Sequence, residues 1–140
     1  MKILSLFFFS TFMTSLFAAD LYRVDTGKIE NYKPHSKKIE VIITEDCAYC
    51  VLQIAELKKC MKTEDVVILI DNYNRLNDIK LKRLIVQKNI PYPTYTLNKE
   101  IEKYYGYKRV TPLGHYKTKK GYVSKEGVVT CGELTGNKES

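Results

Sequence analysis

The stretch IEVIITEDCAYCVLQ, residues 39–53, decides the fold because a buried strand, a cysteine pair and a helix follow one another in it. Residues 39–44 are mostly β-branched and apolar, a pattern typical of a strand that is buried on both faces. Further on, apolar residues recur at helical spacing, at Cys50, Ile54, Leu57 and Met61. We therefore expect an amphipathic helix over residues 48–61, with Cys47 and Cys50 at its first turn.

Two cysteines with this spacing at the start of a helix can act as a redox couple. A thiol attacks a disulfide only as its thiolate, and the free N–H groups and dipole of a helix N-terminus stabilise that anion. Cys47 occupies this position, so it is the predicted nucleophile. Cys50, one turn further on, can attack the mixed disulfide that Cys47 forms and so release the partner.

Two other uses of the Cys47/Cys50 pair compete with redox chemistry. A zinc site needs four ligands, commonly with a second cysteine pair or a pair of histidines. The remaining candidate ligands stand alone in the sequence, at His35, Cys60, His115 and Cys131. We therefore predict no metal site and no cofactor. A purely structural bridge between Cys47 and Cys50 would close a very short loop, which stabilises little through chain entropy.

The N-terminus indicates export, and with it an oxidising compartment. Lys2 supplies a positive charge, residues 3–17 form an apolar run broken only by small hydroxyl residues, and Ala18-Ala19 offers a cleavage site. This pattern is typical of a secretory signal peptide, here over residues 1–19. The apolar run is shorter than the roughly 20 residues that a membrane-spanning helix needs, so we expect no stable membrane insertion after cleavage. The remaining chain suits a single domain.

The charge of the chain gives no sign of a nucleic-acid partner. The formal net charge is +7, but the lysines are scattered along the sequence. A nucleic-acid-binding protein would gather its basic residues into a stripe, and the densest groups here, Lys37-Lys38 and residues 117–120, are short. We therefore predict a solvated basic surface and no nucleic acid as partner.

Strands and helices are predicted to alternate around and after the cysteines. Residues 20–38 are polar and form a lead-in with only a short edge strand at residues 21–24. Residues 66–70 form a second buried strand, and a second helix runs from a cap at Asn72 or Asn74 to about residue 88. The expected inner residues of this second helix are Leu76, Ile79, Leu84 and Ile85.

The chain closes with a third helix and a hairpin. The helix fits residues 99–105 and stops at Gly106, a good C-terminal cap. Strands over residues 113–118 and 122–130 flank a Lys-Lys-Gly turn, which indicates a β-hairpin. The order of strand, helix, strand, helices and hairpin predicts an α/β fold in which helices flank a central mixed sheet.

This order of elements, with a C-x-x-C pair between a strand and a helix, resembles the thioredoxin fold. The similarity covers roughly residues 39–131. The string DCAYC is similar to the C-P-Y-C site of glutaredoxins, and GYKRVTPLGHYKTKKGYVSKEG, residues 106–127, resembles the closing part of exported thioredoxin-like proteins. The resemblance implies one thioredoxin-like domain over residues 39–140, with an insertion at about residues 72–97.

The resemblance also implies where a substrate binds. In such proteins a Thr-Pro with a cis peptide bond faces the redox cysteines, so Thr111 and Pro112 are expected beside Cys47, where they hold substrate by backbone contacts. Pro93 is a rival for the cis-proline, but the hairpin that should come next follows Pro112 instead. Tyr49, between the two cysteines, is expected to contact the substrate.

The sequence also departs from the thioredoxin pattern. Asp46 replaces the tryptophan that precedes the cysteines, and Val41 stands where that family has a buried strand acid. Too few residues follow the last strand for the usual C-terminal helix, which we expect to be absent. A structural disulfide between Cys60 and Cys131 could pin the shortened end, and the alternative is that Cys60 is a free apolar filler of its helix.

We therefore predict a periplasmic or secreted thiol:disulfide oxidoreductase that exchanges disulfides with protein thiols and with a redox partner protein. Glu45 and Asp46 place negative charge beside Cys47, which disfavours its thiolate and favours a reductase or exchange role. His115 could donate a proton, although a lone histidine in a strand is more often structural. The alternatives are a redox-inactive binding module on the same fold, and a copper or zinc carrier that uses the cysteine pair.

Overall fold

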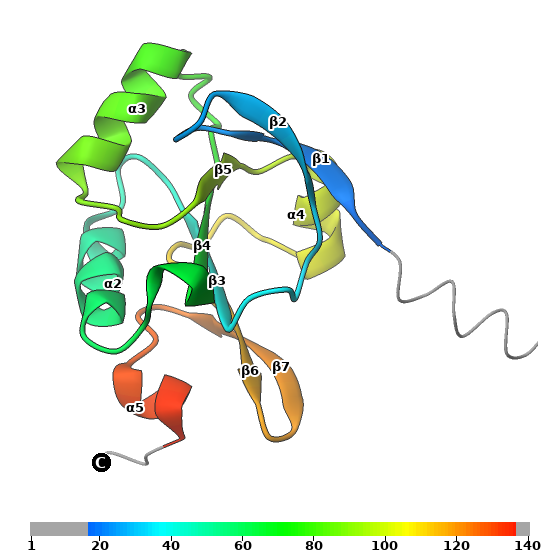
Figure 1. Ribbon diagram of the computed structural model, residues 1–140, viewed down its shortest axis with the longest axis vertical. Helices are drawn as coiled ribbons and strands as arrows, with labels where there is room; N and C mark the ends of the chain where they lie inside the picture. The colour runs from blue at the N-terminus through cyan, green and yellow to red at the C-terminus, as the bar shows by residue number, and fades with distance from the viewer. Residues whose placement is uncertain (1–16, 137–140) are drawn as a thin grey trace, which may run out of the picture.

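A seven-stranded mixed sheet is the frame of the computed structural model, which describes residues 17–136 (Figure 1). In chain order its strands are β1 (Ala19–Arg23), β2 (Lys28–Tyr32), β3 (Ile39–Ile43), β4 (Val66–Ile70), β5 (Thr94–Thr96), β6 (Leu113–Thr118) and β7 (Gly121–Glu126). They lie in the order β2-β1-β5-β4-β3-β6-β7. β4 pairs in parallel with β3 and β5, and the other neighbours are antiparallel. The predicted α/β fold with a mixed sheet is confirmed.

Helices cover both faces of this sheet. They are α2 (Ala48–Lys58), the 3-10 turn η1 (Thr63–Asp65), α3 (Asp78–Gln87), α4 (Lys99–Tyr105) and α5 (Cys131–Thr135). Leu57 of α2 and Leu84 of α3 share one apolar cluster with Val41 of β3. Ile101 of α4 belongs to a second cluster, which includes Ile42 of β3. Val41 and Ile42 thus point to opposite faces of the sheet, as successive residues of a strand do.

The elements that frame the cysteines follow the sequence closely. All residues of β3 and β4 are buried, which confirms both predicted strands, although β3 ends at Ile43, one residue earlier than expected. The predicted helix at residues 99–105 is also confirmed as α4. Asn98 caps its start by accepting a hydrogen bond from the N–H of Ile101, and Gly106 ends it in the left-handed conformation that glycine adopts readily.

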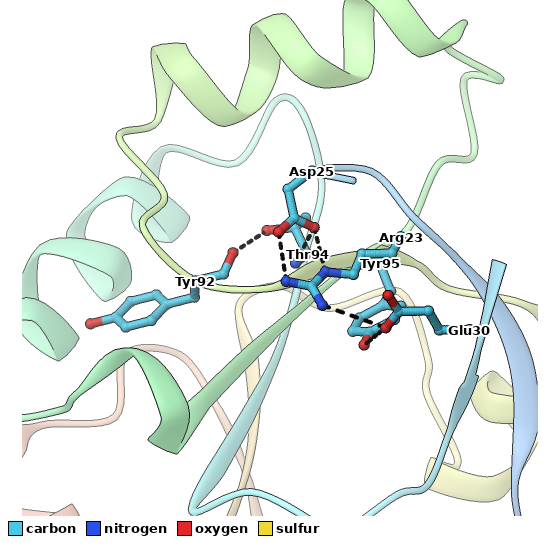
Figure 2. Close-up of polar contacts among 6 residues, drawn as sticks. All are labelled: Arg23, Asp25, Glu30, Tyr92, Thr94 and Tyr95. Carbon is cyan, nitrogen blue, oxygen red and sulfur yellow. Dashed lines mark hydrogen bonds and ion pairs between the residues drawn. The ribbon is translucent and has the colours of Figure 1, made fainter. Parts of the chain in front are cut away.

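The N-terminal segment differs from the predicted lead-in, because it forms a hairpin of two strands that extends the sheet. β1 is an inner strand that pairs with β5, and β2 is the edge. Figure 2 shows the polar contacts at this junction: Arg23 binds Asp25 through two nitrogens at 2.9 and 3.0 Å, and Asp25 accepts a hydrogen bond from the N–H of Thr94. Glu30 of β2 accepts hydrogen bonds from Arg23 and from the Tyr95 hydroxyl. Charged side chains of the segment predicted to be a polar lead-in therefore attach the β1–β2 hairpin to β5.

Helix α3 starts later than the sequence predicts, and its inner face also differs from the prediction. The Asn72 side chain accepts a hydrogen bond from the N–H of Leu76 within the preceding loop, while Asn77 provides the helix cap. Leu81 and Leu84 are the buried residues of the helix. Ile79, predicted to point inward, is 70% exposed, so that part of the prediction is wrong.

The C-terminal end also differs from the expectation that no helix follows the last strand. β7 ends at Glu126 and the chain turns at Gly127, whose φ of 97° suits glycine. A short helix, α5, then begins after Thr130, whose hydroxyl accepts a hydrogen bond from the N–H of Glu133. This helix has five residues, so the fold keeps only a stub at its C-terminal end.

Most of the predicted signal peptide lies outside the described residues, which begin at residue 17. β1 begins at Ala19, the last residue of that predicted segment. Within residues 17–136, no helix has both the length and the apolar character needed to cross a membrane.

Candidate active site

The two cysteines of the C-x-x-C pair lie where β3 leads into α2. Cys47 is the N-cap of α2, with an extended backbone (φ −96°, ψ 106°), and Cys50 follows in the first turn. The pair forms a disulfide with a Cα–Cα distance of 5.3 Å. The N–H of Cys50 points at Sγ of Cys47, 3.1 Å away. The same N–H would stabilise a Cys47 thiolate once the disulfide is reduced.

The two sulfur atoms differ in their access to solvent. Cys47 is half-buried, whereas Cys50 is fully buried in the apolar cluster between α2 and the sheet. A disulfide partner can therefore reach Cys47 but not Cys50. This asymmetry is what an attacking cysteine and an internal resolving cysteine require.

A cavity of about 610 Å³ opens beside Cys47. Its walls come from the loop before α2, the segment that follows β4 and the loop before Pro112. Tyr49 and Val110 line it and are 65% and 43% exposed. An apolar, partly exposed wall next to a reactive cysteine is suited to the side chains of another polypeptide.

Of the three sequence-predicted substrate residues, Tyr49 and Thr111 line this cavity and Pro112 does not. Thr111 lines it together with Cys47, and its hydroxyl is 3.0 Å from the hydroxyl of Thr44, just after β3. The peptide bond between Thr111 and Pro112 is cis, and Pro112 is buried behind Thr111. Pro93, the rival proline, lies just before β5, and its carbonyl accepts a hydrogen bond from the N–H of Ile68.

Sequence reasoning missed an ion pair at the floor of the cavity. Asp71 follows β4 and is only 5% exposed, and its carboxylate accepts hydrogen bonds from Arg109 at 3.2 Å and from the Tyr107 hydroxyl at 2.8 Å. Arg109 adopts the left-handed conformation, with φ 61°, which is uncommon for a residue other than glycine. Burial, followed by the hydrogen bond to Asp71, raises the pKa of Tyr107. An acid directly after a buried strand was the available signal for this site.

Two further residues after β4 bind the acids that precede Cys47. The Tyr73 hydroxyl donates a hydrogen bond to Asp46 at 2.7 Å, and the Asn74 amide donates one to Glu45. The bond from Tyr73 is the main reason why the pKa of Asp46 lies below its usual range. Asp46 therefore carries its negative charge next to Cys47 at neutral pH.

The second cysteine pair lies at the far end of α2. Cys60 and Cys131 form a disulfide with a Cα–Cα distance of 6.0 Å, and this bond attaches α5 to the segment just after α2. The backbone N–H of Cys131 also donates to the Glu56 carboxylate at 2.9 Å. Gln53, fully buried in α2, exchanges two hydrogen bonds with the backbone of Val129. The shortened C-terminal end is thus held against α2 at several points.

His115 does not line the cavity beside Cys47. It lies on β6, is 4% exposed, stacks on Tyr105 of α4 and shares a 2.6 Å hydrogen bond with Ser124. Burial lowers the pKa of His115 to about 4.

Glu40 of β3 is paired with His115 in the sheet and is fully buried. It comes just before Val41, the position at which thioredoxins have their buried strand acid. Burial raises the pKa of Glu40, and Tyr32 donates a hydrogen bond to it.

The part of the chain that the structure describes contains no group of three or more His, Cys, Asp or Glu side chains able to hold a metal ion.

Comparisons with solved structures identify the fold. The chain is similar to StoA of Bacillus subtilis, with a TM-score of 0.63 at 17% identity over 88% of this chain and 97% of that one. It is also similar to a secreted disulfide oxidoreductase of Mycobacterium tuberculosis, homologous to E. coli DsbE, with a TM-score of 0.60 at 12% identity over 85% of this chain and 92% of that one. A third match is the exposed lipoprotein thioredoxin of Streptococcus pneumoniae, with a TM-score of 0.57 at 16% identity over 86% of this chain and 96% of that one. The fold is thioredoxin-like.

Sequence comparisons add nothing to this result, because neither a protein-family model nor a curated protein sequence matches the chain significantly.

Proposed function

We propose that this protein is an exported thiol:disulfide oxidoreductase that exchanges disulfides with other proteins through Cys47 and Cys50. One observation carries the proposal: an accessible Cys47 at a helix N-cap, backed by a buried Cys50, opens onto a partly apolar cavity. The similar structures support it, since they include oxidoreductases with the same fold.

The exchange proceeds in two steps when this protein acts as the reductant. The Cys47 thiolate attacks one sulfur of the partner's disulfide; a mixed disulfide forms, and the partner's other sulfur leaves as a thiolate that takes up a proton. Cys50 then loses its proton and attacks Cys47, and the partner's first sulfur leaves as a second thiolate. The partner gains two electrons and two protons, and the Cys47–Cys50 disulfide forms.

Three neighbouring residues are proposed to hold the partner during this exchange. Tyr49 offers its exposed ring beside Cys47, which suits an apolar side chain next to the partner's cysteine. Thr111 lines the same cavity, and its cis peptide bond to the buried Pro112 is proposed to hold the backbone of residue 111 so that it can pair with an extended segment. Pairing with a backbone is independent of side chains, so it suits an enzyme that accepts several protein substrates.

The proposed direction is reduction or exchange. The negative charge of Asp46 next to Cys47 opposes formation of the Cys47 thiolate and so favours the oxidised form of the pair. Export is proposed from the N-terminal sequence, and two of the similar structures, a secreted oxidoreductase and an exposed lipoprotein thioredoxin, agree with it.

Reduction of insulin by dithiothreitol tests the proposal. We expect the wild-type protein to accelerate insulin precipitation and Cys47→Ser to abolish the acceleration, while Cys50→Ser accumulates a mixed disulfide detectable by mass spectrometry. The double variant Cys60→Ser/Cys131→Ser keeps the redox pair and is the matched control, which should remain active. Full activity of Cys47→Ser would show that the nucleophile is elsewhere. Inactivity of the wild type would favour a binding module, or a metal carrier if copper or zinc binds stoichiometrically.

A further inference from the structure

A groove between α2 and α3 lies next to the candidate active site. Helices α2 and α3 lie on the same side of the molecule (Figure 1). The cavity measures about 470 Å³, and Glu45, two residues before Cys47, is part of its wall. Val51 of α2, 44% exposed, lines it together with Leu76 and Leu84. We call this feature the α2–α3 groove. It combines an apolar floor with a position beside the cysteine that a partner must reach.

The rim of the α2–α3 groove is strongly basic. Lys80, Arg83 and Lys88 line it, and none of them forms an ion pair within residues 17–136. By contrast, Lys82 on the same helix lies outside the groove and pairs with Asp78 at 3.0 Å. Lys80 and Arg83 can therefore pair with an anion from a partner.

Glu45 does not neutralise this rim. It is the only acid among the described residues that line the groove, and its carboxylate accepts a hydrogen bond from Asn74. Lys88 is half-buried; burial lowers its pKa, and the negative charges of Asp46 and Glu45 act in the opposite direction. The lining of the groove thus holds three cations and one acid, which leaves an excess of positive charge.

The position of the groove fixes how far the binding segment lies from the reacting cysteine. Val51 comes four residues after Cys47 in helical geometry, a rise of about 6 Å. An extended chain covers about 3.3 to 3.6 Å per residue, so a segment needs at least about two residues beyond the partner's cysteine to reach the groove. Both contacts can therefore be made by one short stretch of polypeptide.

We propose that the α2–α3 groove binds an acidic segment of the protein whose disulfide is exchanged, with carboxylates on Lys80 and Arg83 and an apolar side chain on the floor. This inference rests on the proposed function and adds the chemical class of the partner. Unpaired cations around an apolar floor complement a segment that alternates acidic and apolar residues. Charge attraction of this kind raises the association rate with acidic partners more than with neutral ones.

Two synthetic peptides test this inference. Each contains one cysteine blocked as an uncharged 2-hydroxyethyl disulfide, followed three residues later by a segment with either four glutamates or four glutamines between leucines. The measured quantity is the second-order rate constant for attack by the reduced protein, followed by mass spectrometry of quenched samples. We expect the glutamate peptide to react roughly tenfold faster at low ionic strength, with the ratio falling toward one in 0.5 M salt.

Matched variants locate the effect in the groove. Lys80→Gln/Arg83→Gln removes two charges from the rim, and Lys119→Gln/Lys120→Gln removes two exposed charges from the turn between β6 and β7. We expect the first variant to lower the glutamate-to-glutamine ratio to about two or less, and the second to leave at least half of the wild-type ratio. Thermal unfolding confirms that both variants fold.

Each other result overturns the inference in a distinguishable way. If the wild type reacts at equal rates with both peptides, it has no preference for an acidic segment; the inference is then wrong, and the proposed function stands. Equal losses in the two variants mean that net charge, and not the groove, attracts the partner. No reaction with either peptide or with 2-hydroxyethyl disulfide alone refutes the proposed function, and this inference falls with it.

Discussion

The Tyr73 hydroxyl donates a 2.7 Å hydrogen bond to the carboxylate of Asp46, the residue just before Cys47. The bond joins the loop after β4 to the loop that carries the redox pair, and it keeps Asp46 ionised by lowering its pKa. A fixed negative charge therefore stands beside the candidate nucleophile. In the proposed reaction this charge opposes the Cys47 thiolate and so favours reduction of the partner.

Asp46→Asn tests the role of this charge. Without it the Cys47 thiolate is more stable, the reduced protein gains free energy, and the reduction potential of the pair should rise by roughly 20 mV. Equilibration with glutathione redox buffers measures the potential. Glu64→Gln, on an exposed residue of η1, is the control and should leave the potential unchanged. A lower potential in Asp46→Asn would contradict the proposed electrostatic role.

The disulfide between Cys60 and Cys131 should contribute strongly to stability. The two cysteines are 71 residues apart, and the chain-entropy model assigns about 4 kcal/mol to a loop of this size. Cys60→Ser/Cys131→Ser should lower the free energy of unfolding in urea by about this amount. The reduction potential of Cys47/Cys50 should change little, because the second pair lies beyond the far end of α2. An unchanged unfolding free energy would mean that the hydrogen bonds between Gln53 and Val129 and between Cys131 and Glu56 alone hold the end of the chain.

The pKa of His115 predicts a loss of stability in mild acid. Burial holds it at about 4 in the folded protein, against an ordinary value of about 6.5 in the unfolded chain. Between these values the unfolded chain binds more protons, so stability falls as the pH drops from about 6.5 to about 4. Glu40, across the strand pair, has a raised pKa and acts in the opposite sense, since it favours the folded state as it takes up a proton.

His115→Phe separates the two contributions, because phenylalanine keeps a ring against Tyr105 but does not titrate. Urea unfolding of wild type and variant should be compared at pH 7 and at pH 4.5. Relative to the variant, the wild type should lose roughly 2 kcal/mol between these values. Parallel pH profiles would show that His115 is not the group that titrates.

The sequence predicts best where local chemistry and tertiary structure agree. β4 and α4 were correct because an unbroken apolar strand and a helix between Asn98 and Gly106 have no competing interpretation. The position of Cys47 at a helix start followed from the same agreement. The cysteine pair lies between β3 and α2, which follow one another directly in the sequence, so this part of the site could be predicted.

The missed features depend on contacts between distant segments. Arg23 and Asp25 look like a polar loop until β5, some 70 residues later, supplies the N–H of Thr94. The pair of Asp71 and Arg109 likewise joins residues 38 positions apart, and no periodicity marks it. Such pairs become visible only when the sheet brings their strands together.

The inner face of α3 shows where the prediction of buried residues failed. Ile79 and Leu84 are five residues apart, about 140° around a helix, so one face cannot bury both. Ile79 is 70% exposed, whereas Leu81 is 4% exposed. Leu81→Ala should therefore lower the free energy of unfolding by about 3 kcal/mol, through lost burial and the cavity left behind. Ile79→Ala is the matched control on the same helix, and it should change the free energy by less than about 0.5 kcal/mol because the side chain is in water. Urea unfolding of both variants measures these values. The reverse order would mean that α3 packs in the phase that the sequence alone suggests, and the basic rim of the α2–α3 groove would then be rotated away from the active site.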